Sequence, residues 1–465
     1  MVRPKIFGIV ALLELMLCLQ TFSQQNNSVH YRVQGLADGK AYLLSVHGKK
    51  YEAVDSVDTK NGEITFILND KMPVGMYRIS FDKDLFTDVI INKENVDIEN
   101  NVNDLYKYLK VIASRENTVY YSYWKASRNI NDTINLIAAM GDKIYEANGH
   151  VLTHDLDSMQ RKAGQLNRKL NIITDSLIAA SNGLLVQKIL LAYRTPDFET
   201  YRRQPGAKPY KKRGDFLKEH YFDNIDFTDS RLLNTEVFHV ACTEYIGMFA
   251  DPASDSIYTS VSDFILSKAI VNPDVYAYFI QLLINTFEDS PWEQTFVHLV
   301  NVAVQENSCN AGTGLKTEKQ KAAAIIRLKT GNVAPQIIMN DASGKPEDLF
   351  AVKAKITLLM FWSPDCEHCA EAMPHIREIY AQYKPMGFEI FAVSVGSDKN
   401  AWQKTVIEKK MVWINVSDLK GPDSDALINY NAWTTPTFIL LDENHKIMAR
   451  PINVAQVKEF LKEKF

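Results

Sequence analysis

The chain has 465 residues, a length that predicts about two to four domains. Its composition, with 46% hydrophobic and 23% charged residues, is ordinary for a globular protein. Lys and Arg together number 52 and Asp and Glu number 56, which gives a formal net charge of -4. This balance excludes the strongly basic class of nucleic-acid-binding proteins, and we expect no nucleic-acid partner.

The first residues have the pattern of an export signal. Arg3 and Lys5 precede a mostly apolar stretch, 6–19, and small residues follow around Thr21-Phe22-Ser23. We therefore predict a signal peptide over residues 1–23 and an exported protein of the cell envelope, located in the periplasm. The alternative is an uncleaved anchor, but a span needs about 20 apolar residues, and Glu14 interrupts this stretch. Cys18 leaves a lipid anchor open, although Leu17 stands where lipoprotein signals have a small residue.

The remaining chain has no stretch of about 18 uninterrupted apolar residues, so we expect no transmembrane span in the mature chain. Removing the signal leaves four cysteines, Cys242, Cys309, Cys366 and Cys369. So few thiols do not predict a disulfide scaffold. Cys242 and Cys309 lie in apolar, helix-like segments, where they either pair with each other or remain buried free thiols.

Residues 24–102 have the pattern of a β domain. Segments rich in β-branched and aromatic residues alternate with turn signals such as Asn61-Gly62 and Pro73-Val74-Gly75. The expected strands are 40–46, 63–68, 76–81 and 88–91. Short strands at this spacing predict a small antiparallel β sandwich. No catalytic cluster is present in its sequence.

Residues 103–332 change to helical periodicity. Apolar residues recur at three- and four-residue spacing over 159–170, 172–191, 262–270, 275–287 and 292–304. Breakers such as Ser181-Asn182-Gly183 and Ser290-Pro291 divide the segment, and we predict an all-α domain. The aromatic residues Tyr120, Tyr121, Tyr123 and Trp124 either line a ligand-binding groove or belong to the core of this domain.

The last segment, residues 333–465, alternates strands and helices. Strands are expected at 356–361, 388–395, 412–416, 437–441 and 446–449, and helices at 367–383, 400–410 and 424–430. A last helix opens with the capping pattern Asn453-x-x-Gln456. This order predicts an α/β domain whose central mixed sheet is covered on both faces.

The residues that carry chemistry lie in the stretch 355–375, KITLLMFWSPDCEHCAEAMPH. A buried-strand pattern ends at Ser363-Pro364-Asp365, and a helix-forming stretch begins at Cys366. At a helix start, backbone N–H groups and the helix dipole stabilise a thiolate and lower the pKa of the thiol. Cys369 lies on the same helix face, so the two sulfurs can close a disulfide. The pattern favours a redox switch.

Two alternatives exist for this cysteine pair: half of a zinc site, or an inert structural disulfide. A structural zinc site needs four ligands, and the last segment offers no second Cys or His pair, so we expect no metal. The two residues between the cysteines are expected to tune the redox potential. A protonated His368 would stabilise the Cys366 thiolate, and Glu367 would oppose it.

The run Phe361-Trp362-Ser363-Pro364-Asp365-Cys366-Glu367-His368-Cys369, with Pro374 and Thr435-Pro436-Thr437-Phe438, resembles the thioredoxin superfamily. Within it, the similarity is to the TlpA/ResA-like thiol-disulfide oxidoreductases of the cell envelope. The resemblance covers residues 333–465. It implies a thioredoxin fold and an enzyme that reduces protein disulfides through Cys366 and Cys369, with no cofactor besides the redox-active disulfide.

The resemblance also implies a cis Thr435-Pro436 bond that faces the cysteines, and substrate contacts by Thr435, Pro436 and Trp362. Two positions depart from the family. Asp365 stands where many relatives have an aromatic residue, and Ala372 stands where ResA-like proteins have a buried glutamate. The nearest acid is Glu371, which either accepts a proton and tunes the cysteine pair or is a surface carboxylate.

Two classes of function follow from the sequence. The first is an exported thiol-disulfide oxidoreductase, with protein thiols and disulfides as substrates and an electron donor on the membrane side. The alternative is an envelope binding or scaffold protein whose helical domain binds a ligand, with the thioredoxin domain as a structural passenger. The intact Cys366, Cys369, Pro374 and Pro436 favour the first class. Residues 24–102 resemble the β domains of unknown function that precede thioredoxin domains in exported bacterial proteins.

Overall fold

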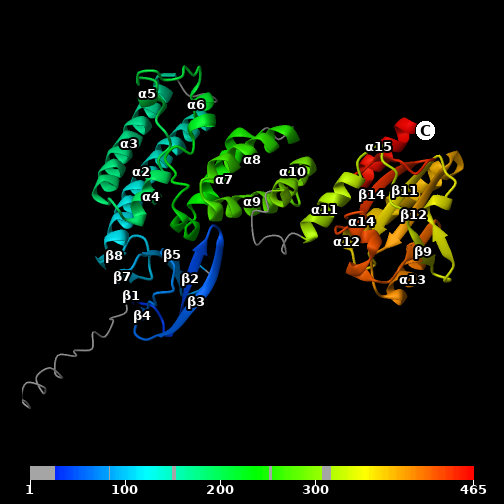
Figure 1. Ribbon diagram of the computed structural model, residues 1–465, viewed down its shortest axis with the longest axis horizontal. Coiled ribbons are helices and arrows are strands. Elements are labelled where there is room, and N and C mark those ends of the chain that lie inside the picture. The colour runs from blue at the N-terminus through cyan, green and yellow to red at the C-terminus, as the bar shows by residue number, and fades with distance from the viewer. Residues whose placement is uncertain (1–26, 83, 149–152, 251–253, 306–315) are drawn as a thin grey trace, which may run out of the picture. The chain divides into compact units, whose positions relative to one another are not determined.

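The computed structural model describes residues 27–82, 84–148, 153–250, 254–305 and 316–465 (Figure 1). The predicted signal peptide, Cys18 and Cys309 lie outside the described residues. The chain forms two compact units. The N-terminal unit comprises residues up to 250 together with 264–279, and the C-terminal unit comprises 251–263 and 280–465.

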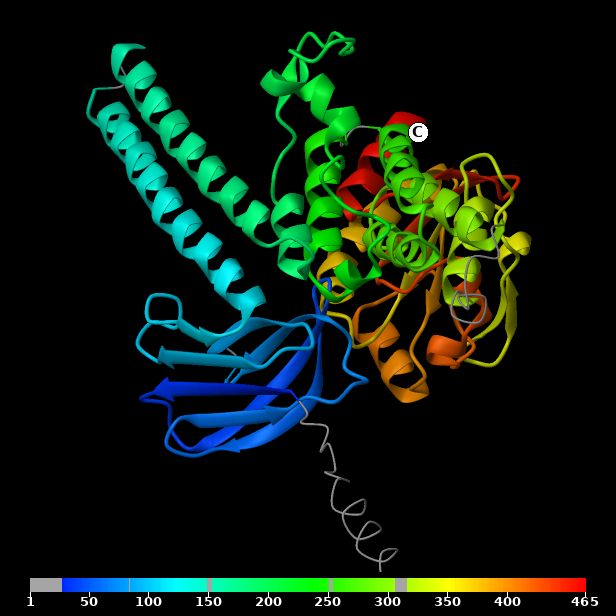
Figure 2. The same cartoon turned by 60° about the vertical axis from the view of Figure 1, so that its left-hand side comes forward.

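The N-terminal unit begins with two four-stranded sheets, ordered β4-β1-β7-β8 and β3-β2-β5-β6. Figure 2 shows them as stacked layers, and a hydrogen bond of 2.7 Å between the hydroxyls of Tyr31 and Thr87 joins them. The pair β1–β7 is parallel, so this sheet is mixed, whereas the second sheet is antiparallel. The strands are β1 (Ser28–Gln34), β2 (Gly39–His47), β3 (Lys50–Thr59), β4 (Glu63–Ile67), β5 (Gly75–Ser80), β6 (Phe86–Ile91), β7 (Val96–Asn101) and β8 (Lys110–Ala113).

Two long helices, α2 (Arg115–Asn148) and α3 (Thr153–Ala180), follow and run side by side (Figure 2). The start of α2 is fixed to the sheet by Asn117, whose side-chain amide exchanges hydrogen bonds of 2.8 Å with both backbone groups of Ile90. The neighbouring Glu116 is fully buried and accepts from the backbone N–H groups of Leu185 and Val186 at 2.8 and 2.7 Å. These contacts connect the β domain to α2, and α2 to the helix that begins at Leu185.

Shorter helices make up the rest of the central region. The predicted helical stretch 172–191 is divided, because α3 ends at Ala180 and the turn at Gly183, with φ of +81°, separates it from the next helix. The helices are α4 (Leu185–Ala192), α5 (Phe198–Tyr201), α6 (Arg213–His220), η1 (Ser230–Asn234), α7 (Val237–Phe249), α8 (Asp255–Ala269), α9 (Pro273–Phe287), α10 (Glu293–Gln305) and α11 (Lys316–Arg327).

The remainder is an α/β domain around a seven-stranded mixed sheet, ordered β10-β9-β13-β12-β11-β14-β15. Its strands are β9 (Ile338–Asp341), β10 (Pro346–Asp348), β11 (Ile356–Trp362), β12 (Phe388–Ser394), β13 (Ile414–Ser417), β14 (Thr437–Asp442) and β15 (Ile447–Ala449). Its helices are η3 (Leu349–Ala351), α12 (Glu367–Tyr383), η4 (Lys384–Met386), α13 (Lys399–Glu408), η5 (Gly421–Asp423), α14 (Asp425–Asn429) and α15 (Val454–Lys464).

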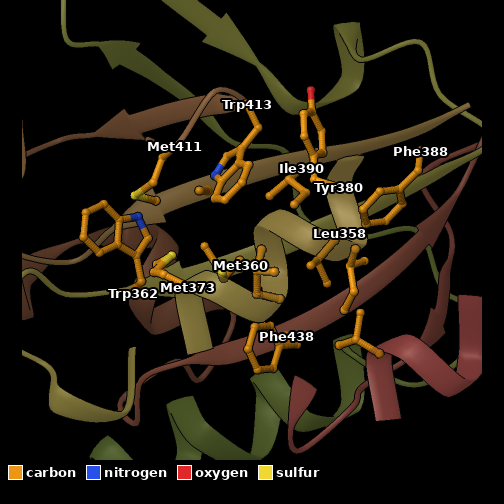
Figure 3. Packing of buried hydrophobic residues seen from close by; sticks show 14 of the residues in the cluster. Leu358, Met360, Trp362, Met373, Tyr380, Phe388, Ile390, Met411, Trp413 and Phe438 are labelled. Carbon is orange, nitrogen blue, oxygen red and sulfur yellow. The ribbon is translucent and has the colours of Figure 1, made fainter. Parts of the chain in front are cut away.

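The central strand β11 is buried along its whole length, so it contributes to a core on each face of the sheet. Leu358 and Met360 point to one face, where they pack with residues of α12, α13 and α15. Leu359 and Phe361 point to the other, where they pack with residues of α14. Figure 3 shows the first core, with Trp362, Met373 and Met411 close together at one end. The predicted fold class, a β domain, a central helical region and a C-terminal α/β domain, is confirmed, but the β domain is not wholly antiparallel as predicted, because β1 and β7 pair in parallel.

Candidate active site

The two cysteines lie at the junction between strand β11 and helix α12. Cys366 is the N-cap of α12, with φ of -89° and ψ of 114°, and its Sγ accepts a hydrogen bond of 3.2 Å from the backbone N–H of Cys369. Both are free thiols. Cys366 is partly exposed, whereas Cys369 is 1% exposed and packs in the core. The predicted position of Cys366 at a helix start is confirmed.

The local environment favours the thiolate of Cys366. Burial raises its pKa, but hydrogen bonds from Cys369, from the Thr435 side chain and from the backbone N–H of His368 outweigh it, so the pKa lies below the ordinary value. N–H groups at the first turn of a helix have no partner within the helix, which leaves them available to a sulfur anion. A partly exposed sulfur with a lowered pKa is the form of cysteine that acts as a nucleophile.

Cys369 has the opposite character. Burial, followed by the hydrogen bond with Cys366, raises the pKa of its thiol to about 12. A thiol of this kind stays protonated near neutral pH and is shielded from solvent by the core around it. The two sulfurs therefore differ in both exposure and acidity, although they lie within one turn of one helix.

The Thr435-Pro436 loop lies against this cysteine pair. The Cys366 thiol donates a hydrogen bond of 3.2 Å to the Thr435 carbonyl oxygen, and the Thr435-Pro436 peptide bond is cis, as predicted. Strand pairing brings the two segments together. β11 runs antiparallel to β14 with Phe361 opposite Thr437, so the end of β11 and the loop before β14 share one edge of the sheet.

The predicted substrate contact by Trp362 does not fit its position. The indole is 1% exposed and packs in the core with Met373 (Figure 3), and its Nε1 has no hydrogen-bond partner among the described residues. Trp362 is the last residue of β11, in a strand buried on both faces. The Trp362 side chain is therefore part of the core and not of the accessible surface.

The three residues predicted to tune the redox potential lie on the exposed face of α12. Glu367 is exposed in the first turn. The side chains of His368 and Glu371 are 83% and 70% exposed, and His368 Nδ1 lies 3.5 Å from a Glu371 carboxylate oxygen. Glu371 is thus a surface carboxylate, the second of the two alternatives. The groups that bond to the Cys366 sulfur include the backbone N–H groups of His368 and Cys369, which residue types alone do not reveal.

The position that differs from ResA-like proteins, Ala372, is 9% exposed. Its neighbour in the chain, Met373, packs in the same core as Cys369. A small apolar side chain therefore stands where the resemblance implied a buried acid, and the thiol of Cys369 keeps the high pKa that its burial gives it.

The aromatic residues of α2 prove to be partly core and partly cavity wall. Tyr120 and Tyr121 are 4% and 6% exposed, and Trp124 is 38% exposed. All three line a cavity of about 420 Å³ in the N-terminal unit, together with Arg78 and Tyr106. Tyr120 and Tyr121 are therefore core residues that also face a cavity, and ligand binding there stays a prediction.

Other observations concern metals, membranes and the third free cysteine. No group of three or more His, Cys, Asp or Glu side chains within the described ranges could hold a metal ion. In the part of the chain that the structure describes, no helix is both long and apolar enough to cross a bilayer. Cys242 is a buried free thiol, and burial raises its pKa to about 12.

Comparisons with known proteins connect this geometry to a family. The thiol-disulfide oxidoreductase ResA of Geobacillus kaustophilus is 32% identical over 136 residues, which are 29% of this chain and 72% of that protein. The chain belongs to the ResA family of thiol-disulfide oxidoreductases. It is 31% identical to ResA of Geobacillus thermodenitrificans over 137 residues, which are 29% of this chain and 76% of that protein.

Family models match three separate parts of the chain, and one of them covers most of the α/β domain. A model of the AhpC/TSA family matches residues 330–450. Two domains of unknown function, DUF4369 and DUF5106, match residues 28–120 and 207–305. A solved thiol-disulfide oxidoreductase of Bacteroides fragilis is 28% identical and covers 29% of this ResA-family chain and 100% of its own, with a TM-score of 0.28.

Proposed function

We propose that the protein is an exported thiol-disulfide oxidoreductase that reduces protein disulfides through the Cys366/Cys369 dithiol. The observation that carries the proposal is the asymmetry of the pair. Cys366 is partly exposed and its pKa is lowered, while Cys369 is buried and its pKa is raised to about 12. An exposed attacking thiolate next to a shielded resolving thiol suits a two-step exchange.

In the first step the Cys366 thiolate attacks one sulfur of a substrate disulfide. An S–S bond forms between Cys366 and the substrate, and the other substrate sulfur leaves as a thiolate and takes up a proton. In the second step Cys369 loses its proton and attacks the Cys366 sulfur. The Cys366–Cys369 disulfide forms, the second substrate thiol is released, and two electrons have passed to the substrate.

Thr435 and Pro436 would hold the substrate chain during the first step. The Thr435 carbonyl oxygen is 3.2 Å from Cys366 Sγ, and backbone groups beside an active cysteine can bond to an extended polypeptide as an added strand does. Glu367 and His368 remain predicted tuning residues through their charges next to the pair. A dithiol donor, which we place on the membrane side, would return the oxidised enzyme to the dithiol form.

Export rests on the first residues of the chain. Arg3, Lys5, the apolar stretch 6–19 and the small residues at 21–23 have the arrangement of a secretory signal. Protein disulfides persist in the compartments to which such a signal leads, so the reaction and the proposed periplasmic location agree. A lipid anchor at Cys18 is the less favoured arrangement, because Leu17 precedes it.

A second candidate function is ligand binding by the N-terminal unit, with the redox domain as a structural passenger. The cavity of about 420 Å³ beside Tyr120 and Trp124 favours it. The two candidates predict different behaviour of the cysteines. A passenger domain does not need a reversible dithiol, whereas the proposed oxidoreductase does.

The deciding experiment is a redox titration of the full-length protein in glutathione buffers, with alkylation and mass spectrometry at each potential. We expect Cys366 and Cys369 to become protected together as a two-electron couple. In the Cys369→Ala variant, mixed disulfides through Cys366 should accumulate. A pair that does not oxidise, or trapping through Cys369 in the Cys366→Ala variant at an equal rate, would contradict the proposal.

A further inference from the structure

The C-terminal unit contains a cavity of about 340 Å³ next to the Thr435-Pro436 loop. The redox domain contributes Trp433 and Pro436 to its wall, and the helices that precede this domain contribute Phe296 from α10 and Lys321 from α11. Nothing in the redox reaction itself requires these two helices. Their presence in the wall makes the cavity a feature of this chain beyond its ResA-like part.

Two consecutive residues of the loop connect the cavity with the Cys366 sulfur. Pro436 lines the cavity, and the preceding residue, Thr435, contacts Cys366 Sγ through its carbonyl oxygen at 3.2 Å. Consecutive residues of an extended chain are about 3.3 Å apart. A polypeptide whose cysteine is joined to Cys366 would therefore bring side chains within a few residues of that cysteine to the cavity.

The wall of the cavity is mixed, and part of it is formed by large apolar side chains. Trp433 is 49% exposed and Ile452 is 80% exposed, and both line it. Phe287 and Phe296, which are 2% and 0% exposed, form part of the wall from the helical side. Large apolar side chains that remain exposed around a cavity indicate a binding site for an apolar group.

Ion pairs account for the positive charges of the wall. Arg450 Nη1 lies 2.8 Å from a carboxylate oxygen of Glu293, the first residue of α10. Lys321 Nζ lies 2.7 Å from a carboxylate oxygen of Asp289, and its side chain is 11% exposed. Cations that are already paired do not favour a phosphate or another small anion as the ligand. The carboxylates in the wall disfavour an anion further, and the exposed apolar part of the wall fits an uncharged, apolar side chain.

We propose that this cavity is a specificity site for substrate polypeptides: it binds an apolar side chain that lies within a few residues of the substrate cysteine. The inference rests on the proposed oxidoreductase function and adds a substrate class to it. Trp433 and Ile452 form the contact surface, and the Arg450–Glu293 pair fixes the start of α10 beside the end of β15. The helical segment before the redox domain thereby selects substrates.

The test uses the full-length Cys369→Ala chain and two nine-residue peptides. Each has a central cysteine in a mixed disulfide with thionitrobenzoate, and they differ only in having leucine or serine two residues from the cysteine on both sides. The Cys366 thiolate attacks the peptide sulfur, the peptide becomes disulfide-bonded to Cys366, and coloured thionitrobenzoate leaves with the electron pair. The ratio of the two second-order rate constants is the readout.

We expect the leucine peptide to react about tenfold faster, the size of effect that burying an apolar side chain supplies. The variants Trp433→Ala and Ile452→Ser should each bring the ratio towards one. The matched control is Ile407→Ser, because Ile407 is 75% exposed on α13 and does not line the cavity. Since both peptides react with one sulfur, a general change in Cys366 reactivity cancels in the ratio.

Two outcomes would overturn the inference: a ratio near one in the chain with an unaltered cavity, or a ratio that the cavity variants leave unchanged. Failure of the proposed function looks different. In that case both peptides release thionitrobenzoate no faster with the Cys369→Ala chain than with the Cys366→Ala, Cys369→Ala double variant. This result would contradict the oxidoreductase function and, with it, the specificity site.

Discussion

The Cys366 thiol lies 3.2 Å from the carbonyl oxygen of Thr435, a residue 69 positions further along the chain. Only the neutral thiol can donate to this carbonyl, whereas the backbone N–H of Cys369 can donate to the sulfur in either form. Ionisation therefore removes the hydrogen bond to the Thr435 carbonyl. Under the proposed function, that oxygen would then accept from a substrate N–H, so thiolate formation and the opening of a docking position would occur together.

The first prediction is the pH dependence of Cys366 alkylation. Thiolate is the reacting form, so the rate rises with pH through the pKa, and a lowered pKa moves the curve to lower pH. We expect a midpoint below about 8.5, the ordinary value for a free thiol. Iodoacetamide labelling of the full chain, with mass spectrometry to locate the label, measures the curve.

Cys369 and Cys242 serve as internal controls in that experiment. Both are buried and their pKa values are raised to about 12, so neither should be labelled below about pH 9 in the folded protein, a bound that follows from thiolate reactivity. A Cys366 midpoint at or above that of a free thiol would show that the helix start does not activate this residue.

The sequence predicts the C-terminal domain well because its strands are short, apolar and bounded by turns. The helix expected at 367–383 coincides with α12, and Cys366 lies where the strand-to-helix pattern predicts it. β3 was not predicted, because most of its residues are polar and exposed on both faces at the edge of its sheet. Trp362 ends the predicted buried strand, and its burial agrees with that pattern, whereas the substrate contact came from the family resemblance alone.

The contacts around the cavity could not be predicted from the sequence either. Arg450 and Glu293 are 157 positions apart, and no local pattern pairs them. Similarly, the N–H groups that bond to the Cys366 sulfur belong to the backbone and leave no residue-type signal. Backbone donors lower the pKa of Cys366, and a long-range ion pair contributes to the cavity wall. Neither can be inferred from the order of residue types, so both are known only from the structure.

A second prediction concerns the backbone at Gly62. Its φ is +76°, and a Cβ at this position would lie 2.2 Å from the carbonyl oxygen of Val33. Gly62→Ala should lower the free energy of unfolding of the β domain by about 2–3 kcal/mol, because the left-handed conformation and the overlap both disfavour alanine. Gly39→Ala is the matched control, since a methyl group there would meet nothing within 4 Å and the φ of Gly39 is not in the left-handed region.

Hydrogen exchange of strands β1 and β4, followed by mass spectrometry, reads out the effect of Gly62→Ala within this domain. Faster exchange in Gly62→Ala than in Gly39→Ala is expected. Equal exchange in the two variants would mean that the loop shifts to accept the methyl group.

The third prediction tests the buried carboxylate of Glu116. It caps the first turn of α4, which has no cap from its own N-cap residue, Leu184. Glu116→Ala leaves two buried N–H groups without acceptors and should cost about 3–5 kcal/mol, whereas Glu116→Gln keeps one acceptor and should cost about half as much. Amide exchange of residues 185–192 measures the loss. The exposed Glu52→Gln, on β3, is the control, and an equal effect of all three changes would contradict a capping role.

The last prediction links the core of the sheet to the burial of the Cys369 thiol. Leu358 is fully buried in the same core as Cys369, so Leu358→Ala removes packing on that face and should lower the free energy of unfolding by about 2–5 kcal/mol. Ile407→Ala changes a side chain that is 75% exposed and should alter the free energy by less than about 0.5 kcal/mol. In a Cys366→Ser background, the guanidinium concentration at which Cys369 becomes open to alkylation measures both changes. The midpoint should fall for Leu358→Ala and stay unchanged for Ile407→Ala; equal midpoints would mean that Cys369 is exposed by a local opening at the start of α12 that does not involve β11.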